Sequence, residues 1–312
     1  MSTIKRIPVI LDGDPGHDDA IAWVLAFARP EFDIRGVISV SGNVAIDKTT
    51  RNMLQIMTLL GKTDIPAARG ATRPLIGPFF DSPSVHGESG LDGPLMPEPT
   101  FELHTLSGVD LMAKILCDSA EPVTIVPTGP LTNVALLLMS YPELREKIAG
   151  ISLMGGGMLM GNWTPAAEYN ILVDPEAAKL VFESGIPITM APLDVTEKAY
   201  VTPVDFERIR AVGNEVGRIV AEWLEFFYQF HLKLGYPGAP VHDPVAVVAL
   251  LNPEILEIHD VYIEVETLGE YCRGATIGDF FGKAGRAPNA RVIMNIDRDA
   301  YVDMIVDAVK QY

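Results

Sequence analysis

Apolar positions along the first 200 residues follow two alternating patterns. Short continuous apolar runs predict buried strands, and the segments after them, with apolar residues every three to four positions, predict helices. The predicted strands are 7–12, 33–40, 122–129, 148–156 and 187–195. The predicted helices are 18–28, 48–61, 109–120, 130–142 and 174–185. Such alternation favours a mainly parallel sheet covered by helices on both faces.

The pattern changes after residue 200. A long, mostly helical stretch is predicted at 206–235, followed by a helix at 242–253, strands at 261–267, 274–281 and 290–296, and a closing helix at 298–312. No repeat, low-complexity linker or charge block divides the chain. We therefore expect one α/β domain over residues 1–312, a mainly parallel, doubly wound sheet flanked by helices with additional elements in the C-terminal third.

Two long segments, 70–104 and 155–173, lack either pattern. Long loops in an α/β protein of this kind are usually functional, so both are predicted to contribute to a site.

Composition narrows the class of protein. The chain has 312 residues and is 48% hydrophobic, which predicts a large core rather than disorder. Its formal net charge is −17 and no basic stripe is present, which argues against a nucleic-acid partner. No apolar run approaches the roughly 18 residues of a membrane span. The short apolar run near the N-terminus ends in acid and does not fit a signal peptide, so we expect a cytoplasmic protein.

The chain contains two cysteines, Cys117 and Cys272. A disulfide between them is possible, but two free thiols in a reducing compartment is the favoured interpretation.

Four aspartates follow the first predicted strand: Asp12, Asp14, Asp18 and Asp19. Parallel sheets bind ligands at the carboxyl ends of their strands. One or two of these carboxylates could simply cap the next helix, but that leaves Asp12 and Asp14 repelling each other. A bound divalent cation accounts for the whole set. Oxygen-only ligands favour calcium or magnesium over zinc.

Further polar clusters lie downstream, each of which alone could be an ordinary loop or cap. They contain Asn43, His86, Asn162, Glu168, Asn170, His242 and Asp243. Amides and carboxylates without a cationic partner suit a polyhydroxylated ligand such as a sugar. The dinucleotide-binding, P-loop and serine-hydrolase motifs are absent from the sequence. The D-x-D after the first strand matches the haloacid dehalogenase phosphatases poorly, because Gly16 stands where they carry Thr or Val.

The motifs together resemble one family. DGDPGHDDA, SGN, HGESG, PTGPLTN, MGGG, NWTPAAEYN-ILVDPEAA and VHDP occur in order between residues 12 and 244. This set resembles the nucleoside hydrolases, metal-dependent enzymes that cut the N-glycosidic bond of ribonucleosides. NWTPAAEYN and HGESGLDGP are most similar to the bacterial pyrimidine-preferring branch. The chain departs at Gly13, where many relatives carry Cys.

The resemblance implies a role for each matching residue. Calcium would be held by Asp14, Asp19, Asp243 and the backbone carbonyl of Thr128, with Asp12 supporting the site and Asp14 also acting as general base on a water. The substrate-binding residues would be Asp18, Asn43 and Asn170 at the ribose hydroxyls or the nucleophile, Asn162 and Glu168 at the 5′-hydroxyl, and Met154 under the sugar. His86 and His242 would face the base, with His242 as its proton donor. A homo-oligomer, tetramer or dimer, is also implied.

The residues that select the base must come from outside this cluster. Segment 226–238 mixes aromatic and polar side chains, and its candidates for base contact are Phe227, Gln229, His231 and Tyr236. The alternative is that its aromatic residues are helix core positions. The helix is expected to end at Gly235, which would leave the tip free to close over a substrate. We expect uridine and cytidine to be cleaved better than inosine, and Gln229→Ala or His231→Ala to change that ratio. If neither does, the 77–90 loop around His86 is the next candidate.

The interpretation is therefore calcium-dependent hydrolysis of ribonucleosides to ribose and free base. Two alternatives stay open at this point: another aspartate-rich hydrolase such as a phosphatase, and a nucleoside- or ribose-binding protein without turnover.

Overall fold

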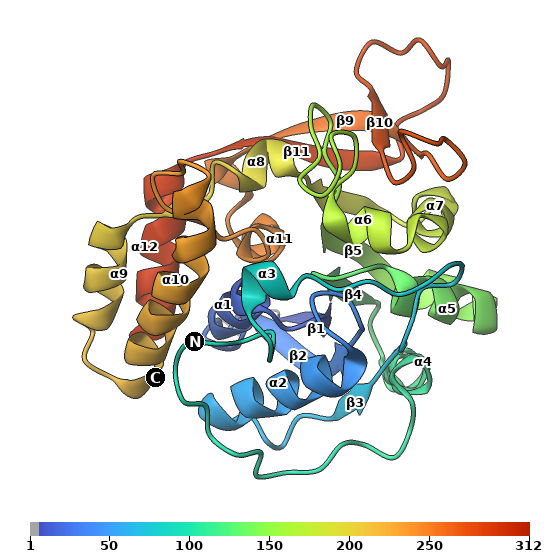
Figure 1. Cartoon of the computed structure of the whole chain (residues 1–312). Helices are drawn as coiled ribbons and strands as arrows, with labels where there is room; N and C mark the ends of the chain where they lie inside the picture. The colour runs from blue at the N-terminus through green and yellow to red at the C-terminus, as the bar shows by residue number, and fades with distance from the viewer. Residues whose placement is uncertain (1–5) are drawn as a thin grey trace.

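The computed structural model describes residues 6–312, whose centre is a nine-stranded sheet (Figure 1). The strand order is β10-β9-β11-β6-β5-β4-β1-β2-β3. The strands are β1 (Ile7–Gly13), β2 (Phe32–Ser39), β3 (Ala67–Arg69), β4 (Val123–Pro127), β5 (Ile148–Met154), β6 (Ile188–Ala191), β9 (Leu256–Val265), β10 (Thr276–Asp279) and β11 (Ala290–Ile296). Neighbouring strands from β3 to β11 pair in parallel, while β9 and β10 pair antiparallel at the other edge.

Helices cover both faces of the sheet (Figure 1). They are α1 (His17–Phe27), α2 (Ile46–Leu59), α3 (Pro83–His86), α4 (Gly108–Asp118), α5 (Thr132–Ser140), α6 (Tyr169–Val173), α7 (Pro175–Glu183), α8 (Leu193–Thr196), α9 (Pro203–Arg210), α10 (Glu215–Lys233), α11 (Pro244–Leu251) and α12 (Arg298–Val309), with 3-10 turns at Pro142–Lys147 and Pro253–Ile255. Two short strands, β7 (Tyr200–Val201) and β8 (Ala239–Pro240), form a separate antiparallel pair.

Alternating side chains of β1 feed two separate hydrophobic cores. Val9 and Leu11 pack with residues of α1, α2, α10, α11 and α12 on one face, and Ile10 packs with residues of α4, α5 and α7 on the other. A strand that is buried on both faces reads as a continuous apolar run, which is why the sequence predicted it correctly. The α/β class and the mainly parallel, doubly wound sheet are confirmed.

The course of the chain creates a topological switch point beside β1. From β1 the chain moves outward through β2 and β3, and β4 then returns to the other side of β1. The loops after β1 and β4 therefore diverge at the carboxyl edge of the sheet. In open α/β sheets this is the position where ligands bind.

Two predicted elements and two segments without a pattern differ from the structure. The strand predicted at 187–195 ends at Ala191, and α8 begins at Leu193, because Pro192 between them lacks the amide that a continuing strand needs. The stretch predicted at 206–235 is two helices, α9 and α10, separated at 211–214, where Gly213 has a φ of 84°. The patternless segments 70–104 and 155–173 contain the short helices α3 and α6.

Two smaller expectations concern the thiols and the chain start. Cys117 and Cys272 are both free, as expected, and the structure shows both to be exposed. The signal-peptide prediction falls partly on residues 1–5, which lie outside the described residues. Across 6–312, no helix combines the length and the apolar character that crossing a bilayer requires.

Candidate active site

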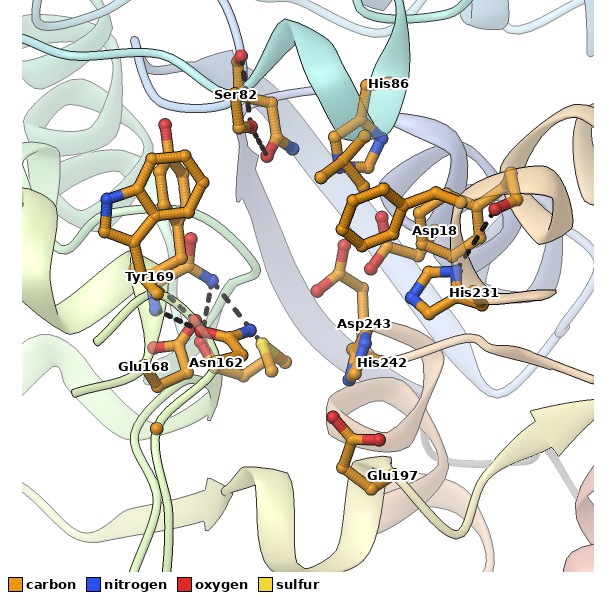
Figure 2. A pocket seen from close by; sticks show the side chains of 18 of the residues that line it. Asp18, Ser82, His86, Asn162, Glu168, Tyr169, Glu197, His231, His242 and Asp243 are labelled. Atoms are coloured by element: carbon orange, nitrogen blue, oxygen red, sulfur yellow. Dashed lines mark hydrogen bonds between the residues drawn. The ribbon is translucent and has the colours of Figure 1, made fainter. Parts of the chain in front are cut away.

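A cavity of about 360 Å³ contains most of the predicted site residues. Its predicted lining residues are Asp18, Asn43, His86, Thr128, Met154, Asn162, Glu168, Asn170, Phe227, His231, Tyr236, His242 and Asp243. Figure 2 shows two walls, one with Tyr169, Asn162 and Glu168 and the other with Asp18, Asp243 and the histidines. Asp12, Asp14 and Asp19 are fully buried and do not line the cavity.

Gln229 is not among the residues that the structure brings together. Its side chain is exposed and donates to the backbone carbonyl of Glu225, one turn earlier on α10. Gln229 lies on the solvent side of α10, whereas Phe227 and His231 of the same helix line the cavity. Phe227 is also 2% exposed, so the core and cavity interpretations of this aromatic residue both hold.

The aspartates are gathered at one point by β1, α1 and α11. Carboxylate oxygens of Asp18, Asp19 and Asp243 lie within 4.8 Å of one another, and all three side chains are buried. Asp243 precedes α11 but its side chain makes no capping hydrogen bond. Helix capping therefore does not explain the position of this carboxylate.

Gly13 provides the space for this arrangement. The hydroxyl of Thr128 donates to Asp19 Oδ1 at 2.6 Å. A Cβ at position 13 would lie 2.5 Å from that Asp19 oxygen and 2.7 Å from the Thr128 hydroxyl oxygen. The glycine thus allows the ends of β1 and β4 to be joined through side chains.

Asp14 has one satisfied and one orphaned oxygen. Its Oδ2 accepts from the backbone N–H of Asn43 at 2.6 Å, whereas its buried Oδ1 has no hydrogen-bond partner within residues 6–312. Burial raises the pKa of Asp14 well above its ordinary value, and repulsion from Asp19 raises it further. An unpaired buried carboxylate oxygen is costly, so a cation fits here.

The neighbouring carboxyls are perturbed in the same direction. Burial, followed by the charge of Asp19, raises the pKa of Asp18 to about 8. Burial raises the pKa of Asp19 to about 6, against hydrogen bonds that lower it. Burial and then the charge of Asp18 raise the pKa of Asp243 well above its ordinary value. The described lining residues include no Lys or Arg, so no protein cation offsets these charges. A group of buried carboxylates without a Lys or Arg partner fits a hard divalent cation, which prefers oxygen ligands.

Asp12 lies beside the aspartate cluster and contacts Asn133 and Thr128. Its Oδ1 accepts from the side-chain amide of Asn133 at 2.7 Å, and its backbone carbonyl accepts from Thr128 N–H at 2.8 Å. Its Oδ2 is buried without a partner in the described chain, and burial raises its pKa to about 7. Asn133, which sequence reasoning did not single out, therefore orients Asp12 and through it the end of β1.

The opposite wall is organised by Glu168. This side chain accepts from the backbone N–H groups of Gly156, Asn170 and Ile171 at 2.8, 2.8 and 3.1 Å, and so caps α6. Burial raises its pKa to about 7, although the backbone hydrogen bonds oppose the shift. Asn162 Oδ1 accepts from Tyr169 N–H at 2.9 Å and fixes the loop before α6.

Asn170 connects this wall to the aspartates. Its side-chain amide donates to the backbone carbonyl of Thr128 at 2.9 Å and lies 3.4 Å from the sulfur of Met154. A carbonyl oxygen has two lone pairs, so Thr128 keeps one for a further partner. Tyr169, missed by sequence reasoning, donates from its hydroxyl to the Gly42 carbonyl at 2.6 Å and holds the Asn43 loop in place.

The far end of the cavity is lined by neutral imidazoles. His242 Nδ1 lies 2.8 Å from the hydroxyl oxygen of Thr196, and His231 Nδ1 lies 3.1 Å from the carbonyl oxygen of Phe227. Burial lowers the pKa of both histidines to about 4. Burial also lowers the pKa of His86, whose ring stacks on Phe227 with centroids 5.3 Å apart.

His17 is a histidine of this region that sequence reasoning passed over. It begins α1, is fully buried, and stacks between His86 and Phe226 with centroids 5.4 and 5.2 Å away. Burial lowers its pKa to about 4. Its position inside the DGDPGHDDA motif was the available signal, but its partners are distant in sequence.

The four-residue helix α8 serves three parts of the cavity at once. Asp194 accepts from the backbone N–H groups of Met158 and Leu159 at 2.6 and 3.2 Å, which anchors the 155–168 loop. Thr196 contacts His242, and Glu197 at the end of the helix lines the cavity beside Tyr236. Burial and hydrogen bonding to Glu197 raise the pKa of Tyr236 to about 12.

Comparisons with known proteins agree with this geometry. Residues 9–303 match the family model described as inosine-uridine preferring nucleoside hydrolase. The chain is 54% identical to the pyrimidine-specific ribonucleoside hydrolase RihA of Escherichia coli O81 (strain ED1a) over 98% of this chain and 99% of that protein. It is 55% identical, with the same coverage, to a protein of the same description from Shigella flexneri serotype 5b (strain 8401).

Solved structures with similar folds carry related descriptions. A purine-preferring ribonucleoside hydrolase from Gardnerella vaginalis superposes with a TM-score of 0.91 at 29% identity, covering 97% of this chain and 98% of that one. The plant nucleoside hydrolase PpNRh1 superposes with a TM-score of 0.91 at 28% identity, covering 97% and 99%.

Proposed function

The chain belongs to the inosine-uridine preferring nucleoside hydrolase family and is a ribonucleoside N-ribohydrolase, and we propose that it acts on pyrimidine ribonucleosides with calcium as its cofactor. The products would be ribose and the free base. One observation carries the proposal: a single cavity brings together a buried aspartate cluster, a wall of amide and carboxylate groups, and an end lined by neutral imidazoles.

The polar walls suit the transition state of glycosidic cleavage. Cleavage passes through an oxocarbenium-like state that gathers positive charge on the ribose. Carboxylate and amide oxygens of Asp18, Glu168 and Asn170 are fixed around the cavity before any substrate arrives. Fixed dipoles and charges of this kind stabilise developing charge without reorganising.

One residue is assigned to accept a proton from the water, and another to donate a hydrogen bond to the leaving base. Asp14, with its unpartnered Oδ1, would accept a proton from the attacking water. The base leaves with negative charge, and His242 would stabilise that charge by donating a hydrogen bond from Nε2–H while keeping its single proton. A neutral imidazole carries one proton, so Nδ1 must then accept from the Thr196 hydroxyl that lies 2.8 Å away.

The proposed calcium site consists of Asp14, Asp19, Asp243 and the free lone pair of the Thr128 carbonyl. The orphaned Asp14 oxygen and the absence of Lys or Arg from the described lining support it. Calcium takes six to eight oxygen ligands, which suits carboxylates, a carbonyl and substrate hydroxyls together. When bound, the ion would supply positive charge that acidifies a water and orients the ribose diol.

Pyrimidine preference is supported by the more similar relatives. The proteins at 54 and 55% identity are described as pyrimidine-specific, while the Gardnerella enzyme at 29% identity is described as purine-preferring. The end of the cavity near His231 and Tyr236 is where the base would lie.

A nucleoside panel tests the proposal directly. Uridine, cytidine, inosine and adenosine would be incubated with the protein, with and without chelator, and released reducing sugar measured. We expect uridine and cytidine to release more sugar than inosine and adenosine, and we expect the chelator to abolish this release. Release of phosphate from nucleotides, with no sugar from nucleosides, would favour a phosphatase. Nucleoside binding without any product would favour a binding protein.

A further inference from the structure

Four aromatic rings form a stack between α1, α3 and α10. His17 lies between His86 and Phe226, and Phe227 stacks against both histidines, with interplanar angles of 15 to 21°. Both imidazoles are buried. The rings are therefore fixed in orientation, and only the positions of their protons are free.

One backbone carbonyl determines the proton position on His17. Nε2 of His17 lies 2.8 Å from the carbonyl oxygen of Asp92. A carbonyl only accepts, so Nε2 carries the proton. Neutral imidazole has a single N–H, which leaves Nδ1 of His17 as an acceptor.

The same logic passes to His86. Its Nδ1 lies 3.1 Å from Nδ1 of His17, so the His86 nitrogen must be the donor. Nε2 of His86 then carries no proton and presents a lone pair as an acceptor. His86 lines the cavity, and within residues 6–312 its ring hydrogen-bonds through Nδ1 and not through Nε2.

The carbonyl that begins this chain of hydrogen bonds is itself held in place. The Asp92 carboxylate accepts from the backbone N–H groups of Glu88 and Ser89 at 2.9 and 3.1 Å. Asp92 N–H donates to the His86 carbonyl at 3.3 Å. The 86–92 loop is thus closed on itself and offers His17 a fixed acceptor.

A competing arrangement places a second proton on His17. The backbone N–H of His17 lies 3.4 Å from His86 Nδ1, a contact that would suit an accepting His86. It requires a cationic His17 that is fully buried, with the Asp92 carboxylate acting on it through charge alone and not through a hydrogen bond. Burying an unpaired charge is costly, so the neutral arrangement is favoured.

We propose that His17 is a positioning residue that fixes the tautomer of His86, so that His86 presents Nε2 as a hydrogen-bond acceptor to an N–H group on the edge of the substrate base. The ligand part rests on the proposed function. Uracil offers the N–H at its position 3, and cytosine offers its amino group, so both pyrimidines carry a donor for this acceptor.

The tautomer is tested in the intact protein without substrate. Protein labelled with ¹⁵N at histidine would be studied by NMR, using ring-nitrogen shifts and two-bond couplings to protons. The spectrum of His86→Gln assigns the His86 signals. We expect the Nδ1–H form of His86 in the parent protein. The Nε2–H form there, or doubly protonated His17, would overturn the proposal whatever the enzyme's substrate.

A variant adds a second readout. His17→Phe keeps a stacked ring and removes both nitrogens, so His86 should move towards the Nε2–H form. An unchanged His86 tautomer in this variant would overturn the assignment. If the variant does not fold, the spectrum of the parent protein still decides.

Kinetics test the ligand part. 3-Methyluridine lacks the N–H at position 3, and we expect the parent to disfavour it against uridine by about tenfold or more in kcat/KM. His17→Phe should bring the uridine-to-3-methyluridine ratio of kcat/KM closer to one. Phe226→Leu removes a neighbouring ring of the same stack without touching a proton, and it should leave the ratio as in the parent. Contact with the base would be overturned if both variants lowered the uridine-to-3-methyluridine ratio of kcat/KM equally. It would also be overturned if His17→Phe instead lost only the discrimination against 5′-deoxyuridine.

Discussion

The hydroxyl oxygen of Thr196 lies 2.8 Å from Nδ1 of His242, so a side chain on α8 sets the orientation of a histidine that precedes α11. Both residues are buried, and Thr196 is the only hydrogen-bond partner of Nδ1 in the part of the chain that the structure describes. The hydrogen bond that we propose His242 donates to the leaving base therefore depends on a residue that does not line the cavity.

Thr196→Val should lower kcat about tenfold while changing KM less. The substitution keeps the shape of the side chain and removes one hydrogen bond, worth about 1 kcal/mol. Thr196→Ser, which restores the hydroxyl, should recover most of the rate. Steady-state kinetics on uridine for the three proteins measure the effect, and an unchanged kcat in Thr196→Val would show that His242 does not need this partner.

Asp14→Asn should reduce turnover about 100-fold or more, because it removes a carboxylate that we propose as both a cation ligand and the general base. Asp118→Asn on the exposed face of α4 is the matched control and should behave as the parent does. Single-turnover rates at saturating uridine and calcium compare them. A rate for Asp14→Asn within tenfold of the parent contradicts the assignment.

Exhaustive chelation should abolish activity, and added calcium should restore it, because the buried carboxylates of Asp14, Asp19 and Asp243 have no protein cation. Calcium titration by calorimetry should lose its signal in Asp19→Asn. Asp18→Asn tests whether Asp18, whose carboxylate lies within 4.8 Å of those of Asp19 and Asp243, also takes part in binding the ion. Full activity in rigorously metal-free protein would rule out the site.

The cation-free protein should lose stability as the pH rises from 6.5 to 8. Burial raises the pKa of Asp18 from 3.8 to about 8 and of Glu168 from 4.5 to about 7, so the folded state holds protons that the unfolded state has released. The free energy of unfolding then falls with rising pH.

The buried histidines contribute little to the change in the free energy of unfolding between pH 6.5 and 8. The pKa values of His17, His231 and His242 are lowered from 6.5 to about 4, so their effect on stability appears only as the pH falls below 6.5. Urea melts at several pH values, with and without calcium, measure both effects. Calcium should stabilise more at pH 8 than at pH 6.5, and the opposite order would contradict the shifts.

Base preference should respond to His231 and not to Gln229. His231→Ala should lower the uridine-to-inosine ratio of kcat/KM about tenfold, since it removes a cavity-lining side chain that can hydrogen-bond the base. Gln229→Ala, two positions away on the exposed face of α10, is the control. Higher kcat/KM for inosine than for uridine in the parent would contradict pyrimidine preference while leaving the hydrolase intact.

Sequence patterns predicted best where burial is two-sided. β1 and the aspartate loop were located because a parallel strand is apolar throughout and its ligands follow its carboxyl end. Asp14, Asn43 and Thr128 therefore meet as the order of strands requires. The predicted helix boundaries differ from the observed ones by a few residues, and these differences do not affect where the three side chains lie.

The missed residues depend on contacts that no local pattern contains. The His17–His86 contact spans 69 positions, and Asn133 reaches Asp12 across 121. Thr196 was hidden because 187–195 has the composition of a strand, and only Pro192 marks the change to α8. Gln229 was included on side-chain chemistry alone, and the helical phase of α10 turned it to solvent.

The arrangement of α8 limits how this enzyme can be redesigned. Asp194 holds the loop that closes one side of the cavity, and Thr196 orients the histidine on the other. A library that varies 193–197 to admit larger bases would also change the partner of His242, so gains in substrate range would be masked by losses in rate. Diversity is better placed on α10, which lines the cavity through Phe227, Phe230 and His231 and makes no hydrogen bond to His242 in the described chain.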